Sequence, residues 1–199
     1  AGLAGAHIED QVNPKRCGHL DGKQVVDTDT ALQRIRAAVD ARRDPNFLIM
    51  ARTDIRAVEG LDAAADRAKA LVDAGADAIF PEAMRDLSEF AAVCAAVDVP
   101  VLANMTEFGK SDLFTVDQLR DAGVQIVIWP VSLLRIAMGA ASRALDTLND
   151  DGHLTSRLGE MQHRADLYDL IDYEGYNRFD SSIFTYTRST DTSSTATKE

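Results

Sequence analysis

The stretch Ala74-Gly75-Ala76-Asp77-Ala78-Ile79-Phe80-Pro81-Glu82 contains the pattern on which the fold prediction rests. Glycine adopts left-handed backbone angles without strain and often ends a helix, and the apolar run after it is typical of a strand buried on both faces. The same plan recurs at 4–9 and at 122–130. We therefore expect three places where a helix ends at an Ala-Gly pair, with the glycine in the left-handed region, and a short strand follows.

Further strands and helices are predicted between these stretches. Apolar runs at 47–52 and 99–104 add two strands, and helical periodicity covers 30–42, 61–74 and 87–97. Strands that alternate with helices predict βαβ units and a parallel sheet, so the chain is expected to be an α/β protein. This order is typical of a barrel.

The remaining segments are predicted to be mostly helical. Thr115 is the expected N-cap of a short helix, helical patterns cover 132–148 and 154–171, and the Ser/Thr-rich segment 189–199 is expected to be disordered. An open doubly wound sheet is the alternative to a barrel. No Gly-x-Gly-x-x-Gly motif follows a strand and no Walker A motif is present, so the sequence does not support nucleotide binding.

The composition of the chain argues against some classes of binding partner and predicts a cellular compartment. Among 199 residues, 32 acidic side chains outnumber 21 basic ones and give a net charge of −11, which argues against binding to nucleic acid or to anionic membranes. No apolar run reaches the roughly 20 residues of a membrane helix, and the sequence begins without the pattern of a secretory leader. Two cysteines cannot form a disulfide framework, so a reducing cytoplasm is expected.

Polar residues follow each predicted strand, where barrel enzymes place their active sites. They are Glu9, Asp10, Arg52, Thr53, Asp54, Glu82, Asn104, Thr106, Pro130 and Ser132. The carboxylates Glu9, Asp10 and Glu82 are suitable ligands for Mg²⁺, but they could equally cap helices or pair with Arg16 and Arg52.

Arginines near these strand ends are candidates for binding a carboxylate. Arg52 ends a strand and is well placed for a two-pronged contact. Arg135 follows the fifth strand and Arg164 lies in a late helix. For Arg135 and Arg164, ordinary surface salt bridges are the simpler interpretation from the residues alone.

Cys17 lies in the polar loop Lys15-Arg16-Cys17-Gly18-His19, directly after the first predicted strand. The three potential cations favour the thiolate form, and such a thiol can act as a general acid or base. The alternatives are an unreactive exposed cysteine, a redox sensor, or part of a zinc site with His7 and His19. Cys94 lies in an apolar helical stretch and is expected to be a core residue.

Several blocks resemble the isocitrate lyase / phosphoenolpyruvate mutase superfamily in sequence and in order. The first is Ala6-His7-Ile8-Glu9-Asp10-Gln11 followed by Lys15-Arg16-Cys17-Gly18-His19, the form typical of its lyases. Later blocks are Ile49-Met50-Ala51-Arg52-Thr53-Asp54, Phe80-Pro81-Glu82-Ala83, Asn104-Met105-Thr106-Glu107-Phe108-Gly109, Pro130-Val131-Ser132 with Arg135, and Met161-Gln162-His163-Arg164.

The resemblance implies a TIM-type (β/α)8 barrel, of which this chain would hold strands four to eight plus the C-terminal helices. Residues 1–188 would then be the C-terminal portion of one barrel domain, followed by the tail at 189–199. The family's main metal-binding aspartates lie in earlier units, which this sequence does not contain. The family also implies a cytoplasmic homotetramer in which neighbouring subunits exchange a C-terminal helix.

The resemblance also implies a carbon–carbon lyase that uses Mg²⁺, with Mn²⁺ as a possible substitute. Cys17 would be the catalytic acid, and Glu9 would hold the metal through water. Binding of a small tricarboxylate substrate would involve Cys17, Gly18, His19, Arg52, Glu82, Asn104, Thr106, Arg135 and Arg164.

The block from Asn104 to Gly109 resembles that of the 2-methylisocitrate lyases, which release pyruvate and succinate. The isocitrate lyases, which release glyoxylate and succinate, are the alternative, but they carry a different block there. A catalytically inactive fragment or an assembly-only subunit is the alternative from another class, because missing strands would leave sheet edges and apolar helix faces exposed.

Overall fold

The computed structural model describes residues 2–185, so the segment predicted to be disordered at 189–199 lies outside the described residues. The chain divides into two compact units, Ala1–Met138 and Gly139–Glu199.

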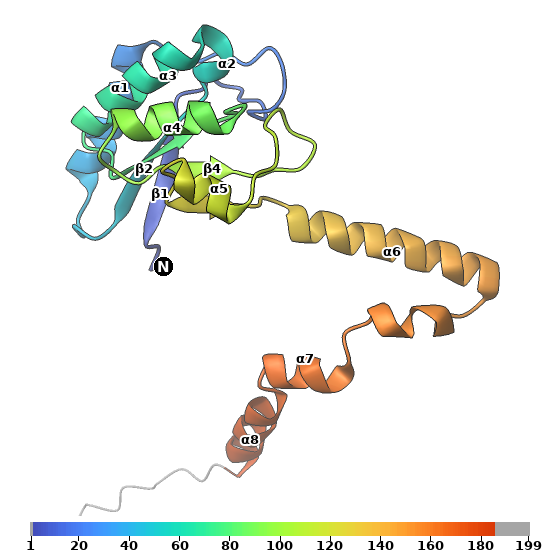
Figure 1. The fold of residues 1–199 in the computed structure, drawn as a ribbon. Helices are drawn as coiled ribbons and strands as arrows, with labels where there is room; N and C mark the ends of the chain where they lie inside the picture. Colours follow the sequence, from blue (N-terminus) through green and yellow to red (C-terminus); the bar gives the residue numbers. More distant parts are fainter. Residues whose placement is uncertain (1, 186–199) are drawn as a thin grey trace, which may run out of the picture. The chain divides into compact units, whose positions relative to one another are not determined.

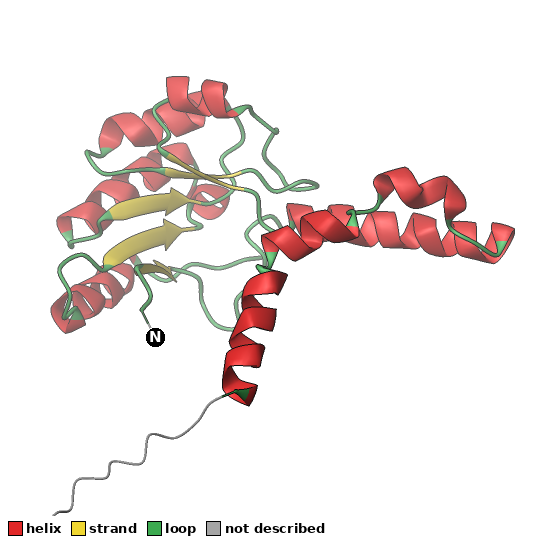
Figure 2. Ribbon diagram, turned by 90° about the horizontal axis from the view of Figure 1, so that it is seen from below, coloured by secondary structure: helices red, strands yellow, loops and turns green. Residues whose placement is uncertain are grey.

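The first unit contains five parallel strands in sequential order (Figure 2). The strands are β1 (Gly5–Glu9), β2 (Leu48–Thr53), β3 (Ala78–Pro81), β4 (Leu102–Asn104) and β5 (Ile126–Ile128). β1 pairs with β2, β2 with β3 and β4 with β5, while a parallel bridge between Ile79 and Val101 connects the two sets. A doubly wound sheet reverses its strand order at a switch point, and this order does not reverse.

Helices α1 (Thr28–Ala41), α3 (Leu61–Asp73), α4 (Leu87–Ala96) and α5 (Val116–Asp121) lie between the strands in the chain (Figure 1). They pack on one face of the strands, where Ile35, Leu71, Phe90 and Leu119 meet Ile79 and its strand neighbours in the main core. The opposite face carries a second cluster made of Met50, Ala78, Phe80 and Leu102 with Leu48, Ile126 and Ile128, all of them strand residues. Helices on one face and strand side chains on the other are typical of a barrel wall.

Two of the three Ala-Gly pairs end helices as predicted. Gly75 after α3 has φ 103° and Gly123 after α5 has φ 95°. In each case the residue after the glycine donates to a carbonyl five residues earlier, Ala76 to Leu71 and Val124 to Leu119, which is the Schellman arrangement. Both glycines therefore stop a helix and turn the chain into the next strand.

The prediction for Gly5 was wrong. Gly5 is the first residue of β1 and is not among the residues with positive φ. A Cβ atom there would stand 2.7 Å from the Leu48 carbonyl oxygen and 2.9 Å from Leu48 Cβ. The glycine is therefore needed for the close approach of β1 to β2, which a local sequence pattern does not distinguish from a helix stop.

Most predicted boundaries in the first unit agree with the structure to within a few residues. Asp27 and Asp86 cap α1 and α4, and Thr115 caps α5 in a reciprocal capping box with Gln118. The strand predicted at 99–104 is shorter, because only Leu102–Asn104 pairs continuously. A short helix, α2 (Arg56–Glu59), was not predicted.

The second unit consists of helices. α6 (Ser132–Asp151) begins in the first unit and continues into the second, followed by η1 (Thr155–Glu160), α7 (Arg164–Leu170) and α8 (Tyr173–Phe184). The helix predicted at 154–171 is interrupted, and His163 caps α7 by accepting from the Ala165 N–H. α8 was not predicted. Among residues 2–185, no helix is long and apolar enough to cross a membrane.

Candidate active site

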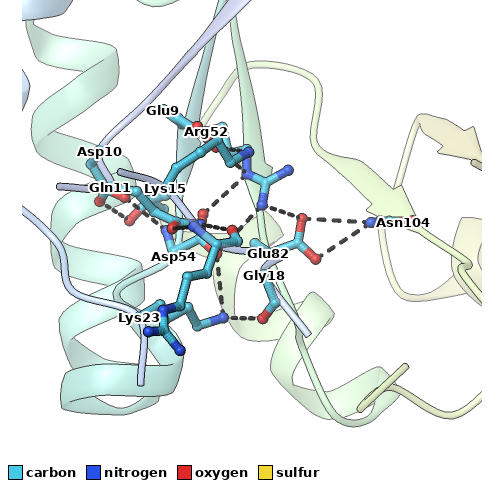
Figure 3. A network of polar contacts seen from close by, with 12 residues as sticks. Glu9, Asp10, Gln11, Lys15, Gly18, Lys23, Arg52, Asp54, Glu82 and Asn104 are labelled. Carbon is cyan, nitrogen blue, oxygen red and sulfur yellow. Dashed lines mark hydrogen bonds and ion pairs between the residues drawn. The ribbon is translucent and has the colours of Figure 1, made fainter. Parts of the chain in front are cut away.

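The carboxyl ends of β1, β2, β3 and β4 bring the predicted polar residues together (Figure 3). The strands are parallel and in register, so that Glu9 of β1 pairs with Arg52 of β2 and Arg52 pairs with Phe80 of β3. Glu82 follows β3 directly. Side chains from neighbouring strand ends therefore meet at one edge of the sheet, as the sequence predicted.

Arg52 is at the centre of this cluster. Its Nε lies 3.0 Å from Asp54 Oδ2 and 3.3 Å from Glu9 Oε2, and its Nη2 lies 3.0 Å from Glu82 Oε2. Burial by itself lowers the pKa of Arg52, but the hydrogen bond to Asp54 and the charges of Glu82, Asp54 and Glu9 outweigh it, so the pKa is raised. The guanidinium also lies 4.9 Å from the centre of the Phe80 ring.

Glu82 is buried and contacts three of the other predicted site residues. Besides Arg52, its carboxylate lies 2.8 Å from His19 Nε2 and accepts from Asn104 Nδ2 at 3.4 Å. The amide nitrogen of Asn104 must face Glu82, because its carbonyl oxygen would repel the carboxylate. Asn104 Oδ1 is thereby left buried without a hydrogen-bond partner among the described residues.

The loop after β4 fixes the protonation pattern of His19. The backbone N–H of Lys110 donates to His19 Nδ1 at 2.9 Å, so Nδ1 is the acceptor nitrogen and Nε2 carries the proton of the neutral ring. Nε2 forms no hydrogen bond within the described residues, because its N–H is poorly aligned with Glu82. The ring is therefore oriented toward the cluster, with Nε2 against the Glu82 carboxylate.

Cys17 is exposed, and the two residues after it approach the cluster. Two of the potential cations expected near Cys17 contact carboxylates instead. Lys15 lies 2.7 Å from Glu9, and the His19 ring faces Glu82. The backbone of Arg16 is held by the Gln11 side chain, which donates to Arg16 O and accepts from Arg16 N, both at 2.9 Å. Leu20 N donates to Cys17 O at 2.9 Å and closes a turn.

Asp10 is buried, and its side-chain contacts are to residues of β2, of α3 and directly after β2. It is 2% exposed and accepts from Thr53 Oγ1 at 2.6 Å and from Asp54 N at 2.9 Å, and it pairs with Arg67 Nη1 at 3.0 Å. Arg67 lies in α3 and was not predicted, because a helical arginine looks solvent-exposed in sequence. Asp10 therefore ties β1 to β2 and α3 rather than facing the cluster.

Thr106 and Arg135 meet in a second group of polar residues. Arg135 Nη1 lies 3.4 Å from Thr106 Oγ1, 2.9 Å from Glu107 O and 3.1 Å from Glu107 Oε2. Ser132 Oγ donates to Glu107 Oε2 at 2.8 Å, and this hydrogen bond lowers the pKa of Glu107, with help from Arg135. Glu107 was not predicted as a site residue, although it binds Arg135, which was predicted.

Arg164 is not brought into either group. It is the first residue of α7 and is exposed, in the second unit. Its expected role in substrate binding stays a prediction.

Lys23 is a further member of the cluster around Arg52, and it was not predicted as a site residue. Its side chain is 3% exposed, donates to Gly18 O, and lies 3.3 Å from Asp54 Oδ1. A lysine is rarely this buried unless it is paired. The signal that could have identified it is its position at the end of the loop, where the next residues return to the sheet.

The described residues do not form a divalent-metal site by themselves. The carboxylates of Glu9, Asp54 and Glu82 are matched by the cations of Lys15, Lys23 and Arg52, and no group of three His, Cys, Asp or Glu side chains within 2–185 is arranged to hold an ion. Glu9 Oε2 already contacts two cations. The expected water-mediated contact of Glu9 with Mg²⁺ therefore stays a prediction.

Cys94 packs against the main core. Burial raises its pKa to about 11, so it is a poor thiolate at neutral pH. Both cysteines are free.

Comparison with known proteins gives consistent matches. The family model described as phosphoenolpyruvate phosphomutase matches residues 1–149. The chain is 56% identical over 186 residues to probable 2-methylisocitrate lyase 2 of Corynebacterium glutamicum, covering 94% of this chain and 61% of that protein. It is 49% identical to 2-methylisocitrate lyase of Escherichia coli, covering 92% of this chain and 62% of that protein.

Solved structures match the fold. The structure of oxaloacetate acetylhydrolase with the inhibitor 3,3-difluorooxalacetate aligns with a TM-score of 0.82 at 35% identity, covering 93% of this chain and 63% of that one. A structure of 2,3-dimethylmalate lyase aligns with a TM-score of 0.79 at 34% identity, covering 90% and 60%. The chain thus spans about three fifths of the length of the relatives it matches.

Proposed function

Because the chain belongs to the phosphoenolpyruvate phosphomutase family, within the isocitrate lyase superfamily, we propose that the whole protein cleaves 2-methylisocitrate to pyruvate and succinate. Relatives named 2-methylisocitrate lyase at 49–57% identity support this substrate. The observation that carries the proposal is the convergence of Arg52, Glu82, His19 and Asn104 beside the Cys17 loop.

The reaction needs a proton acceptor and a proton donor. A base takes the C2 hydroxyl proton, the C2–C3 bond breaks, and its electron pair remains on the succinate fragment as a carbanion stabilised by the neighbouring carboxylate. We assign Cys17 as the acid that protonates this carbon, because the two residues after it contact Glu82 at the end of β3. The product pair is then pyruvate and succinate, with all protons accounted for.

A substrate with three carboxylates requires several donors. Two of the proposed donors, His19 Nε2 and Asn104 Nδ2, face the Glu82 carboxylate in this structure, at 2.8 Å and 3.4 Å. Arg52 and Arg135 are both held by carboxylates in this structure, Arg52 by Glu82 and Arg135 by Glu107. We infer that substrate carboxylates replace some of these contacts, so that Glu82 and Glu107 keep the arginines in place until substrate arrives. Arg164 and Thr106 complete the proposed set.

Larger features of the whole protein are part of the same proposal. The five sequential strands would be strands four to eight of a barrel, residues 1–188 would belong to one barrel domain, and Mg²⁺ would bind through ligands beyond the residues described here. The exposed apolar side chains of α6, among them Leu133, Leu145 and Ile136, support a homotetramer in which C-terminal helices are exchanged. Two free cysteines support a cytoplasmic location.

A lyase assay on the protein expressed from its complete reading frame tests the proposal. With Mg²⁺ present, we expect pyruvate release from 2-methylisocitrate to exceed glyoxylate release from isocitrate, and we expect Cys17→Ser to abolish it. Faster glyoxylate release would identify an isocitrate lyase instead. Absence of both products in the complete protein would overturn the lyase assignment and favour an assembly role.

A further inference from the structure

The loop that carries Cys17 is attached to the sheet by a buried lysine (Figure 3). Lys23 Nζ donates to the carbonyl oxygen of Gly18 and lies 3.3 Å from Asp54 Oδ1. The Lys23 side chain is 3% exposed and that of Asp54 is 0% exposed. A charged pair this deep loses its hydration, so both partners must be satisfied inside the protein.

Asp54 provides a fixed anchor for this lysine. It follows β2 directly, its backbone N–H donates to Asp10 at 2.9 Å, and its carboxylate lies 3.0 Å from Arg52 Nε. The connection therefore runs from the end of β2 through Asp54 and Lys23 to the peptide between Gly18 and His19. Replacing a buried ion pair with apolar side chains is often neutral for stability. What the ion pair adds here is a fixed position for one carbonyl group.

That carbonyl group lies between the two residues proposed to act on substrate. Cys17 precedes Gly18 and His19 follows it. Fixing this peptide group therefore also fixes the backbone positions from which the thiol and imidazole side chains extend. Glu82 packs directly against Gly18, since a Cβ atom built on Gly18 would lie only 2.2 Å from Glu82 Cγ. Lys23 thus holds one side of Gly18 while Glu82 limits the other.

We propose that Lys23 is a positioning residue, which holds the Cys17–His19 segment at the end of β2. The catalytic use of that segment rests on the function proposed above. The physical role of Lys23, holding the loop in one conformation, does not.

The loop offers its own matched control. Lys110 forms an ion pair with Asp21 of the same loop, but there the side chains are 37% and 94% exposed. Exposed ion pairs contribute little because water and salt screen them. Lys110→Met removes a lysine contact to this loop without disturbing the buried one, and the backbone bond from Lys110 to His19 remains.

Hydrogen exchange followed by mass spectrometry on the 199-residue chain tests the proposal without substrate. The reporters are the amides of 12–22, which include Arg16 and Leu20 with their hydrogen bonds inside the loop. The reference is helix α3. We expect Lys23→Met to speed exchange in 12–22 by about 10-fold or more, with exchange in α3 unchanged. Without the contacts of Lys23 to Gly18 and Asp54, the loop opens locally more often. Lys23→Arg should restore most of the protection, and Lys110→Met should change exchange by less than about threefold.

Unchanged loop exchange in Lys23→Met would overturn the proposal, as would an equal effect of Lys110→Met. If Lys23→Met speeds exchange in α3 as well, the uncompensated charge of Asp54 has destabilised the whole unit. The double variant Lys23→Met/Asp54→Asn then decides, because it removes both charges and still lacks the tie to Gly18. Fast loop exchange with a protected α3 supports the proposal, and a protected loop refutes it.

A kinetic measurement on the complete protein separates this proposal from the lyase assignment. Lys23→Met should lower kcat by a larger factor than it raises KM, because it displaces the proposed acid Cys17 while the substrate contacts of Arg52, Asn104 and Arg135 are retained. If the unaltered protein has no lyase activity, the proposed function fails, while the exchange result still decides the role of Lys23.

Discussion

Gly18 and Glu82 approach so closely that only a glycine fits at position 18. A Cβ atom built there would stand 2.2 Å from Glu82 Cγ and 2.7 Å from Arg52 Nη2. The backbone of the Cys17 loop therefore rests directly on the side chains of Arg52 in β2 and Glu82 after β3. Any side chain at this position must push the loop away from the strand ends.

Gly18→Ala should lower lyase activity by about 100-fold, because small displacements of catalytic groups have effects of that size. The fold should persist, since residues 12–22 lie outside both hydrophobic core clusters, and circular dichroism would show a cooperative melting curve. Gly159→Ala is a matched control, because a Cβ there meets nothing within 4 Å. Similar activities for the two variants would contradict the close packing of the loop.

Cys17→Ser should abolish turnover and leave the structure intact, because a serine hydroxyl is a far weaker acid than a thiol. Pyruvate release measures the first effect and circular dichroism the second. Cys94→Ala serves as the control, because Cys94 packs in the core: it should retain activity and lose about 1 kcal/mol of stability. A Cys17→Ser variant with a near-normal rate would exclude the proposed acid.

Arg52→Lys should reduce both activity and stability. Arg52 reaches Glu82 through Nη2 while its Nε contacts Asp54 and Glu9, and a single ammonium group cannot reproduce this geometry. We expect a loss of about 1–3 kcal/mol in the free energy of unfolding, the range for hydrogen bonds to charged groups. Urea titration measures the change in the free energy of unfolding, and initial rates of pyruvate release measure the change in activity.

Arg120→Lys is the comparison for Arg52→Lys. Arg120 pairs with Asp117 at 2.7 Å, but both side chains are mostly exposed. Its substitution should change neither rate nor stability measurably. Equal effects at positions 52 and 120 would count against a central role for Arg52.

Glu89 should make stability depend on pH in the acid range. Burial by itself raises the pKa of Glu89, but hydrogen bonds from Arg56 and from the Arg85 N–H outweigh it, so the folded pKa lies below the ordinary 4.5. The carboxylate therefore adds stability above about pH 4.5, and this contribution is lost as the pH falls through the lower folded pKa. Urea titrations of Glu89→Gln and the unaltered chain should differ by about 1–2 kcal/mol at neutral pH and converge once the pH has fallen below the lowered folded pKa of Glu89. A constant difference would contradict the shift.

The sequence predicted the features that depend on local chemistry. Thr115 caps α5, Gly75 and Gly123 stop helices, and Asp54 and Glu82 gather at strand ends, because each follows from backbone geometry or from parallel strand order. These rules act within a few residues or within one repeating unit. They were sufficient for the order of the strands and for the position of the cluster at the strand ends, but not for α2, α8 or the buried Lys23.

What the sequence did not predict depends on contacts between distant residues. Gly5 was assigned to a helix end, because its close approach to Leu48 involves a residue 43 positions later. Lys23 and Arg67 look like surface residues until the fold places Asp54 and Asp10 beside them. The pairing of Arg135 with Glu107 likewise depends on how the loop after β4 meets the start of α6.

Gly75 and Gly123 lie at the opposite ends of their strands from the cluster around Arg52. The backbone turns that start β3 and β5 are thus independent of the loops that carry chemistry. A library randomised only at exposed loop positions, such as Leu20, Asp21, Lys110, Asp112 and Leu113, would sample new substrate preferences at little risk to folding, whereas variation at the two glycines would be removed as misfolded protein. The scaffold is therefore suited to acquiring new specificities by exchange of loops alone.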